Sequence, residues 1–481
     1  MKRVCLATLC VMAGLVMTGA AQEPGASAPA GSQPAVTFHK DVLPILQKNC
    51  QSCHRPGQIG PMPLLTYQQA RPWAHSIKAK VASRQMPPWL ADPRYGHFLN
   101  DTSLKASDIE TLVAWADRGA AEGNPADAPP AVNFPAQGWL IQPDLTLDLP
   151  AYDLPATGVI DWEAIAVPSP FKEDTWVTSI EMMQSEPGVV HHMCFDVVPH
   201  RPEIVYNQYE WMEQPKDDTG VAARPAGVAP NQGAPRGGRG DGVVLMRKVG
   251  ASRDEVQRRS GRAIAAGANT FCWEHGLPSV DYRPLGAGRL IPGGSDLIVT
   301  SHYTTNGKTP VVNRPRIGFT VAKQPPSSKF VAFTLAPNTA EFAIPPNDGN
   351  WKSPSASTTF KQDVLLTWFW PHAHMRGKDF TYTLEYPDGR KEIVLHVPRY
   401  DYAWELQYMT RISVPKGTKI TADAHFDNST ANRTNPNPNT WVYWGQQRWE
   451  EMMAGIFGVV VETSVKDSDI TTSGRLGAAG G

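Results

Sequence analysis

The chain has 481 residues, which is enough for roughly three domains of ordinary size. Its formal net charge of -1 gives no electrostatic basis for binding nucleic acid or an anionic membrane surface. The 44 prolines and 40 glycines, with only 19% charged residues, favour a turn-rich β protein over a helical bundle.

The first 21 residues are predicted to form an export signal. The basic pair Lys2-Arg3 precedes an apolar run, Val4–Val16, and small residues follow it. The alternative is a retained membrane anchor, but the run is short for a membrane span. Residues 22–35 are predicted to be a flexible linker. No other stretch is long and apolar enough to cross a bilayer, so we expect a mature chain without a membrane span, periplasmic or secreted.

Residues 36–123 have a helical pattern. Three helices are expected, the last within 103–123, where Ile109, Leu112, Val113 and Ala116 recur at helical spacing. The sequence therefore predicts a small α domain of about 90 residues, bounded by the linker before it and a Pro/Ala-rich stretch after it.

A haem-attachment motif lies within this segment. Cys50 and Cys53 can each form a thioether to a haem vinyl group, and the next residue, His54, can bind the iron. The alternative is a zinc or redox CxxC, which the adjacent histidine and predicted export disfavour. We expect one covalent haem c. Met86, before a stiff Pro-Pro, is favoured as the sixth ligand over Met62. The segment resembles a class I cytochrome c domain, which suits electron transfer.

The remaining chain alternates in short runs separated by Pro, Gly, Asn and Asp. In 380–386 aromatic and apolar residues alternate with polar ones, and Pro387-Asp388-Gly389 can form a hairpin turn. Such spacing predicts β-sandwich architecture. We expect two sandwiches, 137–323 and 330–465, followed by a tail, 466–481. The Pro/Gly/Arg-rich insertion 213–242 cannot bury a core and is predicted to be a disordered surface loop.

Two histidine pairs are candidate metal ligands. His372 and His374 are two residues apart at the end of a predicted strand, so both can point to one face and chelate one ion. His191 and His192 are adjacent, so joint binding requires a bulge or different ring nitrogens. With His302 and Met452, the set combines imidazole and thioether, which favours copper. A lone histidine in such a strand would usually be structural.

Four segments, VVHHM, SHYTTNGK, HAHMRG and WEEMMAG, resemble in order and spacing the type II copper, ascorbate-dependent monooxygenases. The resemblance covers roughly residues 137–465. It implies two jelly-roll-like sandwiches that face each other across a solvent cleft, and two copper ions. An electron-transfer copper would be held by His191, His192 and His302. The copper that binds O2 and substrate would be held by His372, His374 and Met452, which are the implied catalytic residues, with Met453 as the alternative to Met452.

The implied activity is hydroxylation of a C–H bond of a small organic substrate with O2, with electrons relayed from the haem and an external donor that reduces the haem. The chain departs from the peptide-amidating members of the family, which have an arginine where Trp370 stands and a tyrosine where Ile456 stands. A C-terminal glycine peptide is therefore not the expected substrate. Trp368, Phe369 and Trp370 indicate either an apolar substrate or simply core packing.

Other residues leave further alternatives. Cys194 and Cys272 can form a disulfide in an oxidising compartment. His275 and His425 are interpreted as structural. A different class of function is a haem and copper electron-transfer or copper-binding protein without hydroxylase activity. A zinc-dependent hydrolase is disfavoured because no HExxH-like carboxylate accompanies the histidines.

Overall fold

The fold is described from a computed structural model. It describes residues 36–134, 139–158, 160, 163–200, 202, 204–207, 209–212, 243–244, 246–247, 264–265, 271–338, 341–445, 448–472 and 475–476. The predicted export signal, the linker 22–35 and the insertion 213–242 lie outside these residues, so their predictions stay untested. Val36–Gly481 forms one compact unit. In the described part of the chain, no helix is long and apolar enough to cross a membrane.

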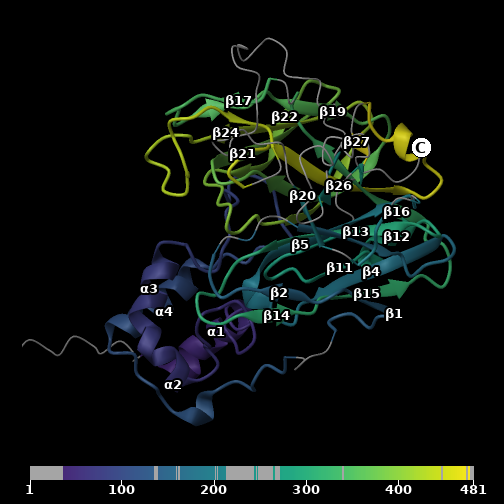
Figure 1. Ribbon diagram of the computed structural model, residues 1–481. Helices are drawn as coiled ribbons and strands as arrows, with labels where there is room; N and C mark the ends of the chain where they lie inside the picture. Colours follow the sequence, from purple (N-terminus) through teal and green to yellow (C-terminus); the bar gives the residue numbers. More distant parts are fainter. Residues whose placement is uncertain are drawn as a thin grey trace, which may run out of the picture. The chain divides into compact units, whose positions relative to one another are not determined.

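Short helices occupy the N-terminal part of this unit (Figure 1). They are a π-helix, Phe38–Val42, followed by α1 (Leu43–Asn49), α2 (Tyr67–Ala70), α3 (Ala74–Ala82) and α4 (Ala106–Asp117), with 3-10 turns at Arg71–Trp73 and Pro125–Asp127. Leu112 and Ala116 of α4 are buried, and Ile109 and Val113 pack against the same small core, as their helical spacing predicts. Phe38 and Trp115 are fully buried there.

The prediction of an all-α cytochrome c domain was wrong. The helices are short, and turns and extended chain fill the stretches between α1 and α2 and between α3 and α4. Prolines explain part of this, because a proline inside a helix removes a backbone hydrogen bond. The segment is also not self-contained: Trp89, Leu90 and Phe98 pack against the core of the C-terminal β-sheets. Most regular structure in the described chain is β-strand.

Three large sheets carry the rest of the unit. The largest has ten strands, eight of them in the order β1 (Leu145–Asp148), β15 (Arg316–Val321), β4 (Thr175–Met183), β12 (Ala287–Ile291), β16 (Ser328–Leu335), β26 (Ala454–Glu462), β20 (Val364–His372) and β23 (Tyr408–Val414), with β11 (Ser279–Asp281) beside β4 and β27 (Arg475–Leu476) beside β16. A six-stranded sheet has the order β10 (Phe271–Trp273), β5 (Val190–Val198), β13 (Asp296–Tyr303), β3 (Glu163–Pro168), β6 (Tyr209–Met212) and β8 (Met246–Arg247).

A five-stranded sheet and three strand pairs complete the β structure. The sheet has the order β18 (Trp351–Lys352), β24 (Lys419–Phe426), β21 (Gly377–Glu385) and β22 (Lys391–Val397), with β19 (Ala356–Thr359) also on β24. The pairs are β14 (Val311–Asn313) with β2 (Tyr152–Leu154), β17 (Ala343–Ile344) with β25 (Val442–Tyr443), and β7 (Val243–Val244) with β9 (Ile264–Ala265). The remaining 3-10 turns are Pro187–Val189, Arg283–Leu285 and Asp467–Asp469.

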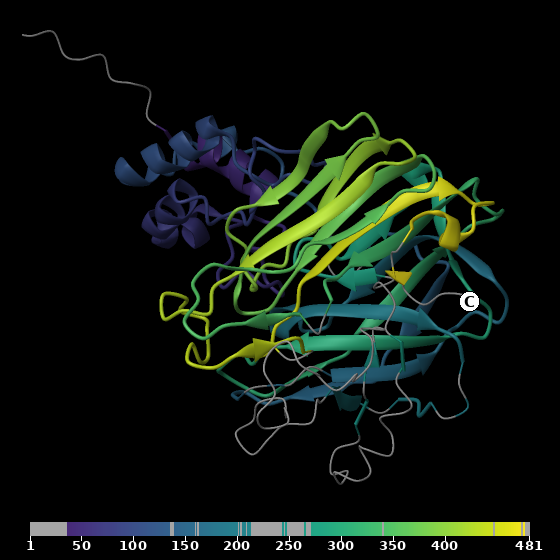
Figure 2. The ribbon, with the colours of Figure 1, turned by 90° about the horizontal axis from the view of Figure 1, so that it is seen from above.

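The prediction of two separate jelly-roll-like sandwiches was also wrong. One sheet runs through both predicted regions, because β12 pairs in parallel with β16 and joins the strands of the two halves. Figure 2 shows the blue and teal N-terminal strands beside the green and yellow C-terminal strands. The six-stranded sheet shares a core with the N-terminal half, and the five-stranded sheet shares one with the C-terminal half. The two histidine pairs thus belong to one packed unit.

Candidate metal centre

His191, His192 and His302 meet where β5 pairs with β13. His192 is directly opposite His302 in the antiparallel register, and the register then shifts so that Tyr303 pairs with Val190. His191 has no partner residue on β13 at this bulge, which turns its side chain toward the neighbouring histidines. Of the two alternatives for this pair, a bulge or different ring nitrogens, the register shift corresponds to the first. The Nδ1 atoms of His191 and His192 lie 3.0 Å apart, and the three side chains each offer a ring nitrogen within 4.8 Å of the others.

His372 and His374 lie at the end of β20. Their ring centroids are 5.3 Å apart, so the two histidines come together as their spacing predicts. Their neighbour is β26, in which Ala454 pairs with His372. Beyond this last pair, His374 lies two residues after the end of β20 and Met452 lies two residues before the start of β26. Met452 is buried, whereas the alternative Met453 packs in the hydrophobic core of the C-terminal half.

The carboxylate of Glu451 holds these two strand ends together. Its Oε2 accepts hydrogen bonds from the backbone N–H of His374 at 2.8 Å and of Met452 at 3.2 Å. Its other oxygen accepts the N–H of Arg376 at 2.6 Å. Because one oxygen binds the backbone of both His374 and Met452, the two candidate ligands are anchored at a common point.

The two histidine groups form one cluster. The ring centroids of His192 and His372 are 6.5 Å apart. We call His191, His192, His302, His372 and His374 together the five-histidine cluster. The exposed fractions of His192, His302, His372 and His374 are 4%, 8%, 7% and 3%, and His191 is only partly buried. The resemblance implied a solvent cleft between the two copper sites. Instead, the two histidine groups adjoin each other, and four of the five side chains are buried.

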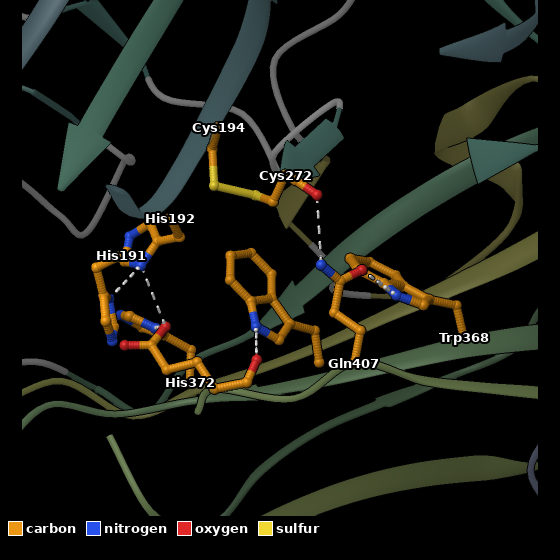
Figure 3. Close-up of a disulfide and its surroundings, with 9 residues drawn as sticks. His191, His192, Cys194, Cys272, Trp368, His372 and Gln407 are labelled. Carbon is orange, nitrogen blue, oxygen red and sulfur yellow. Dashed lines mark hydrogen bonds and ion pairs between the residues drawn. A yellow bond between two sulfur atoms is a disulfide. The ribbon is translucent and has the colours of Figure 1, made fainter. Parts of the chain in front are cut away.

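A disulfide stands beside the cluster (Figure 3). Cys194 of β5 is bonded to Cys272 of β10, so the predicted disulfide is confirmed. The two cysteines pack against Trp370, Ala454 and Ile456 of the large sheet. Because Cys194 is two residues from His192 and Trp370 is two residues from His372, this contact brings the two histidine groups together.

Two residues of the loop between β22 and β23 complete the cluster, and the sequence did not reveal them. The hydroxyl of Tyr402 lies 3.0 Å from Nδ1 of His302, and its ring stacks on His191 with centroids 5.1 Å apart. Glu405 Oε2 lies 2.8 Å from Nδ1 of His372. Neither residue is at a metal-ligand spacing from a histidine in the chain. Only the tertiary fold identifies them.

Burial sets the protonation preferences of the cluster. It lowers the pKa of His192 and His374 well below the ordinary histidine value, with neighbouring histidines adding to the effect. Burial, with His191, Arg448 and His372 nearby, lowers the pKa of His302 to about 3. These three rings are therefore neutral near pH 7 and present lone pairs for a metal. His372 differs: burial alone would lower its pKa, but the charge and hydrogen bond of Glu405 raise it.

The aromatic residues next to His372 belong to the packing. Trp370 is 2% exposed and its indole N–H donates to the backbone carbonyl of Glu405 at 2.9 Å. Phe369 is fully buried in the C-terminal core, and the indole of Trp368 donates to Gln407 at 2.8 Å. Ile456 packs beside Trp370 and the disulfide. The core alternative for these aromatics therefore agrees with the structure.

The two remaining histidines of interest have local partners. His275 packs edge-on against Trp273, with ring centroids 4.9 Å apart, and burial lowers its pKa to about 4. Nδ1 of His425 lies 2.8 Å from Asp379 on the adjacent strand β21. Both sets of contacts suit the structural roles predicted for these histidines.

The haem-attachment motif lies in the turn after α1. Cys50 and Cys53 are unbridged and partly buried, and burial raises the pKa of both thiols, that of Cys50 to about 12. Nδ1 of His54 lies 3.1 Å from the backbone carbonyl of Met62, which leaves Nε2 for a ligand. A Cβ at Gly60 would lie 2.7 Å from this same Nδ1, so a larger residue at this position would force His54 to shift. Met86 is partly buried in the turn after α3 and takes no part in these contacts.

Comparisons with known proteins add little. No family model and no curated protein matches the chain. Two similar solved structures are those of infectious bursal disease virus. The Gx strain structure is 9% identical over 69% of this chain and 76% of that chain, with a TM-score of 0.16. The Gt strain structure is 11% identical over 70% of this chain and 77% of that chain, also with a TM-score of 0.16. A likeness this weak carries no inference about fold or function.

Proposed function

We propose that this chain is an exported copper-dependent monooxygenase that hydroxylates a C–H bond of a small organic substrate with O2. The observation that supports it best is the five-histidine cluster. Its members come from two distant histidine pairs and His302, and imidazoles together with the thioether of Met452 are a donor set suited to copper. The resemblance to type II copper monooxygenases supplies the reaction class.

The ligands divide into two groups. His191, His192 and His302 would hold one ion, since their ring nitrogens already lie within 4.8 Å of one another. The second ion would be held by His372, His374 and Met452. Copper bound in these groups would supply electron transfer and the activation of O2.

The surrounding residues would position these ligands and exclude water from them. Glu451 anchors the backbone of His374 and Met452, and the Cys194–Cys272 disulfide packs against the strand that carries His372. Trp370 occupies the position of a carboxylate-binding arginine in peptide-amidating enzymes, and its buried indole offers no positive charge. This supports a substrate other than a C-terminal glycine peptide.

A covalent haem c at Cys50 and Cys53 would supply electrons to the copper sites. The residues fit this group: a metal-binding histidine usually hydrogen-bonds its other ring nitrogen to a carbonyl or carboxylate, as His54 Nδ1 does with Met62. Met62 contacts His54 through its backbone carbonyl, and Met86 would be the sixth ligand, as the sequence predicts. An external donor would reduce the haem.

Metal and haem quantification tests the proposal. Exported wild-type protein should contain two copper ions and one haem per chain, with EPR signals of type II copper. His302→Ala should lose about one copper ion. His275→Ala is the matched control, because it changes another, partly buried histidine near His191 and should keep both ions. A wild-type protein that takes up no copper contradicts the proposal.

A second candidate is an electron-transfer or copper-binding protein without hydroxylase activity. The burial of Phe369 and Trp370 favours it, because these aromatics present no open surface to a substrate. Anaerobic reduction of the haem followed by O2 separates the candidates. The hydroxylase requires O2 uptake coupled to a hydroxylated product, whereas the carrier reoxidises without product. Haem reoxidation that is independent of copper at His191, His192 and His302 would exclude the electron relay.

A further inference from the structure

Glu405 is held in place by its backbone. Its φ of +26° lies in the left-handed region, which is unfavourable for a residue with a side chain. Its N–H donates to Asp401 O at 3.3 Å, and its carbonyl accepts the indole N–H of Trp370 at 2.9 Å. A strained backbone that neighbouring contacts maintain often marks a functional position. Here it directs the side chain toward the five-histidine cluster.

The carboxylate of Glu405 lies between the two histidine groups. Oε2 accepts the hydrogen bond of His372 Nδ1 at 2.8 Å and lies 3.9 Å from Nδ1 of His192. The residue is only 2% exposed, and Oε1 has no hydrogen-bond partner within the described part of the chain. Burying a carboxylate with one oxygen unsatisfied is costly. A purely structural role would be better served by a residue with both polar atoms satisfied, or by an apolar one.

We propose that Glu405 is a positioning residue that orients His372 for metal binding and joins the two histidine groups into one centre. By accepting the Nδ1 proton, it selects the ring form whose Nε2 carries the lone pair, so His372 binds through Nε2. Its negative charge also lies beside the cations that the five-histidine cluster would hold. The inference rests on the proposed copper function.

Two substitutions separate positioning from charge. Glu405→Leu removes the acceptor at similar size, and Glu405→Gln keeps an acceptor oxygen without the charge. Copper affinity of the metal-free protein is measured by competition with a chelator, together with the Cu(II) EPR spectrum. Glu405→Leu should weaken one of the two sites roughly 10- to 100-fold and change its hyperfine splitting. Glu405→Gln should lose less. Equal losses in both variants would overturn the positioning role.

Controls make the test independent of folding. Glu274→Gln changes a buried carboxylate close to Glu405 that makes no described contact with a histidine ligand, and should leave affinity unchanged. In a His372→Ala background, Glu405→Gln should lower the copper affinity less than it does in the wild-type background, because the positioning action passes through His372. An equal loss in both backgrounds overturns the inference even if Glu405→Leu does not fold. If wild-type protein binds no copper, the proposed function fails. If wild type binds copper and Glu405→Leu matches it, only this inference fails.

Discussion

His191 and His192 are neighbours in the chain, and neighbouring strand residues ordinarily point to opposite faces of a sheet. The register shift between β5 and β13 removes this restriction, and both rings come close to His302. From their spacing alone, joint binding by His191 and His192 required a bulge or different ring nitrogens, and the structure has a register shift at this point. The same reasoning did not reach Glu405, because its relation to His372 depends on a loop conformation that no local pattern encodes.

Substitution of single residues can also distinguish Met86 from Met62 as the sixth haem ligand. Met86→Leu should abolish the methionine–iron charge-transfer band of the oxidised haem and lower its reduction potential, because a thioether ligand raises the potential. Met62→Leu is the matched control and should keep the band, since its hydrogen bond with His54 is made by the backbone carbonyl, which the substitution retains. Absorption spectroscopy and redox titration measure both. Loss of the band in Met62→Leu alone would reverse the assignment.

At the scale of elements, the candidate ligands lie on or beside the ends of paired strands. β20 ends at His372, with His374 two residues beyond it, and Met452 lies two residues before the start of β26. Glu451 closes this pair by binding the backbone N–H groups of both strand ends. On the facing sheet, the disulfide ties β10 to β5 next to His192. The cluster therefore depends on two independently anchored strand pairs.

Removing the disulfide should destabilise the protein more than it changes metal ligation. Cys194 and Cys272 are 78 residues apart. Cross-linking over such a separation restricts the unfolded chain and stabilises the fold by about 2–4 kcal/mol. Cys194→Ala with Cys272→Ala should lower the free energy of unfolding by this amount in urea titrations. A reducing agent should then have no further effect on the variant. Unchanged stability would show that the disulfide does not constrain the fold.

At the scale of the whole molecule, the helical segment and the sheets are one packed unit. Trp89 and Phe98 pack against Tyr408, with their ring centroids 5.1 and 5.4 Å from that of Tyr408. The backbone continues this contact: Leu99 N–H donates to Met409 O at 2.7 Å, and Met409 N–H donates to Asn100 at 2.8 Å. On one side, the contact begins at Trp89, three residues after Met86. On the other side, it begins at Tyr408, the first residue of β23, three residues after Glu405. The predicted haem ligand and the cluster are thus linked through one interface.

Weakening this interface should loosen the helical segment. Trp89→Ala should cost about 2 kcal/mol, because the ring is partly buried in an aromatic group. Limited proteolysis should then cut within residues 89–105 much faster than in wild type. Trp73→Ala is the matched control, since Trp73 is 43% exposed. Equal cleavage of both variants would show that Trp89 does not hold the segment in place.

How much the sequence revealed depended on how local each feature is. The helical spacing around Leu112, the His-x-His pair and the cysteine pairing all follow from short-range pattern or from compartment chemistry, and the structure agrees. The division into an α domain and two sandwiches failed, because it assumed that each stretch of chain closes its own core. The parallel pairing of β12 with β16 and the docking of Trp89 cross those boundaries.

The sequence by itself determined the candidate ligands: a CxxCH motif, five histidines and a methionine, whose donor types are properties of the residues alone. The tertiary structure decided how the histidines are arranged. The contact of Trp370 with the disulfide brings the ring centroids of His192 and His372 to 6.5 Å, so the two predicted groups adjoin. It also placed Tyr402 and Glu405 beside them. These are contacts between residues far apart in the chain, and long-range packing, not local pattern, sets them.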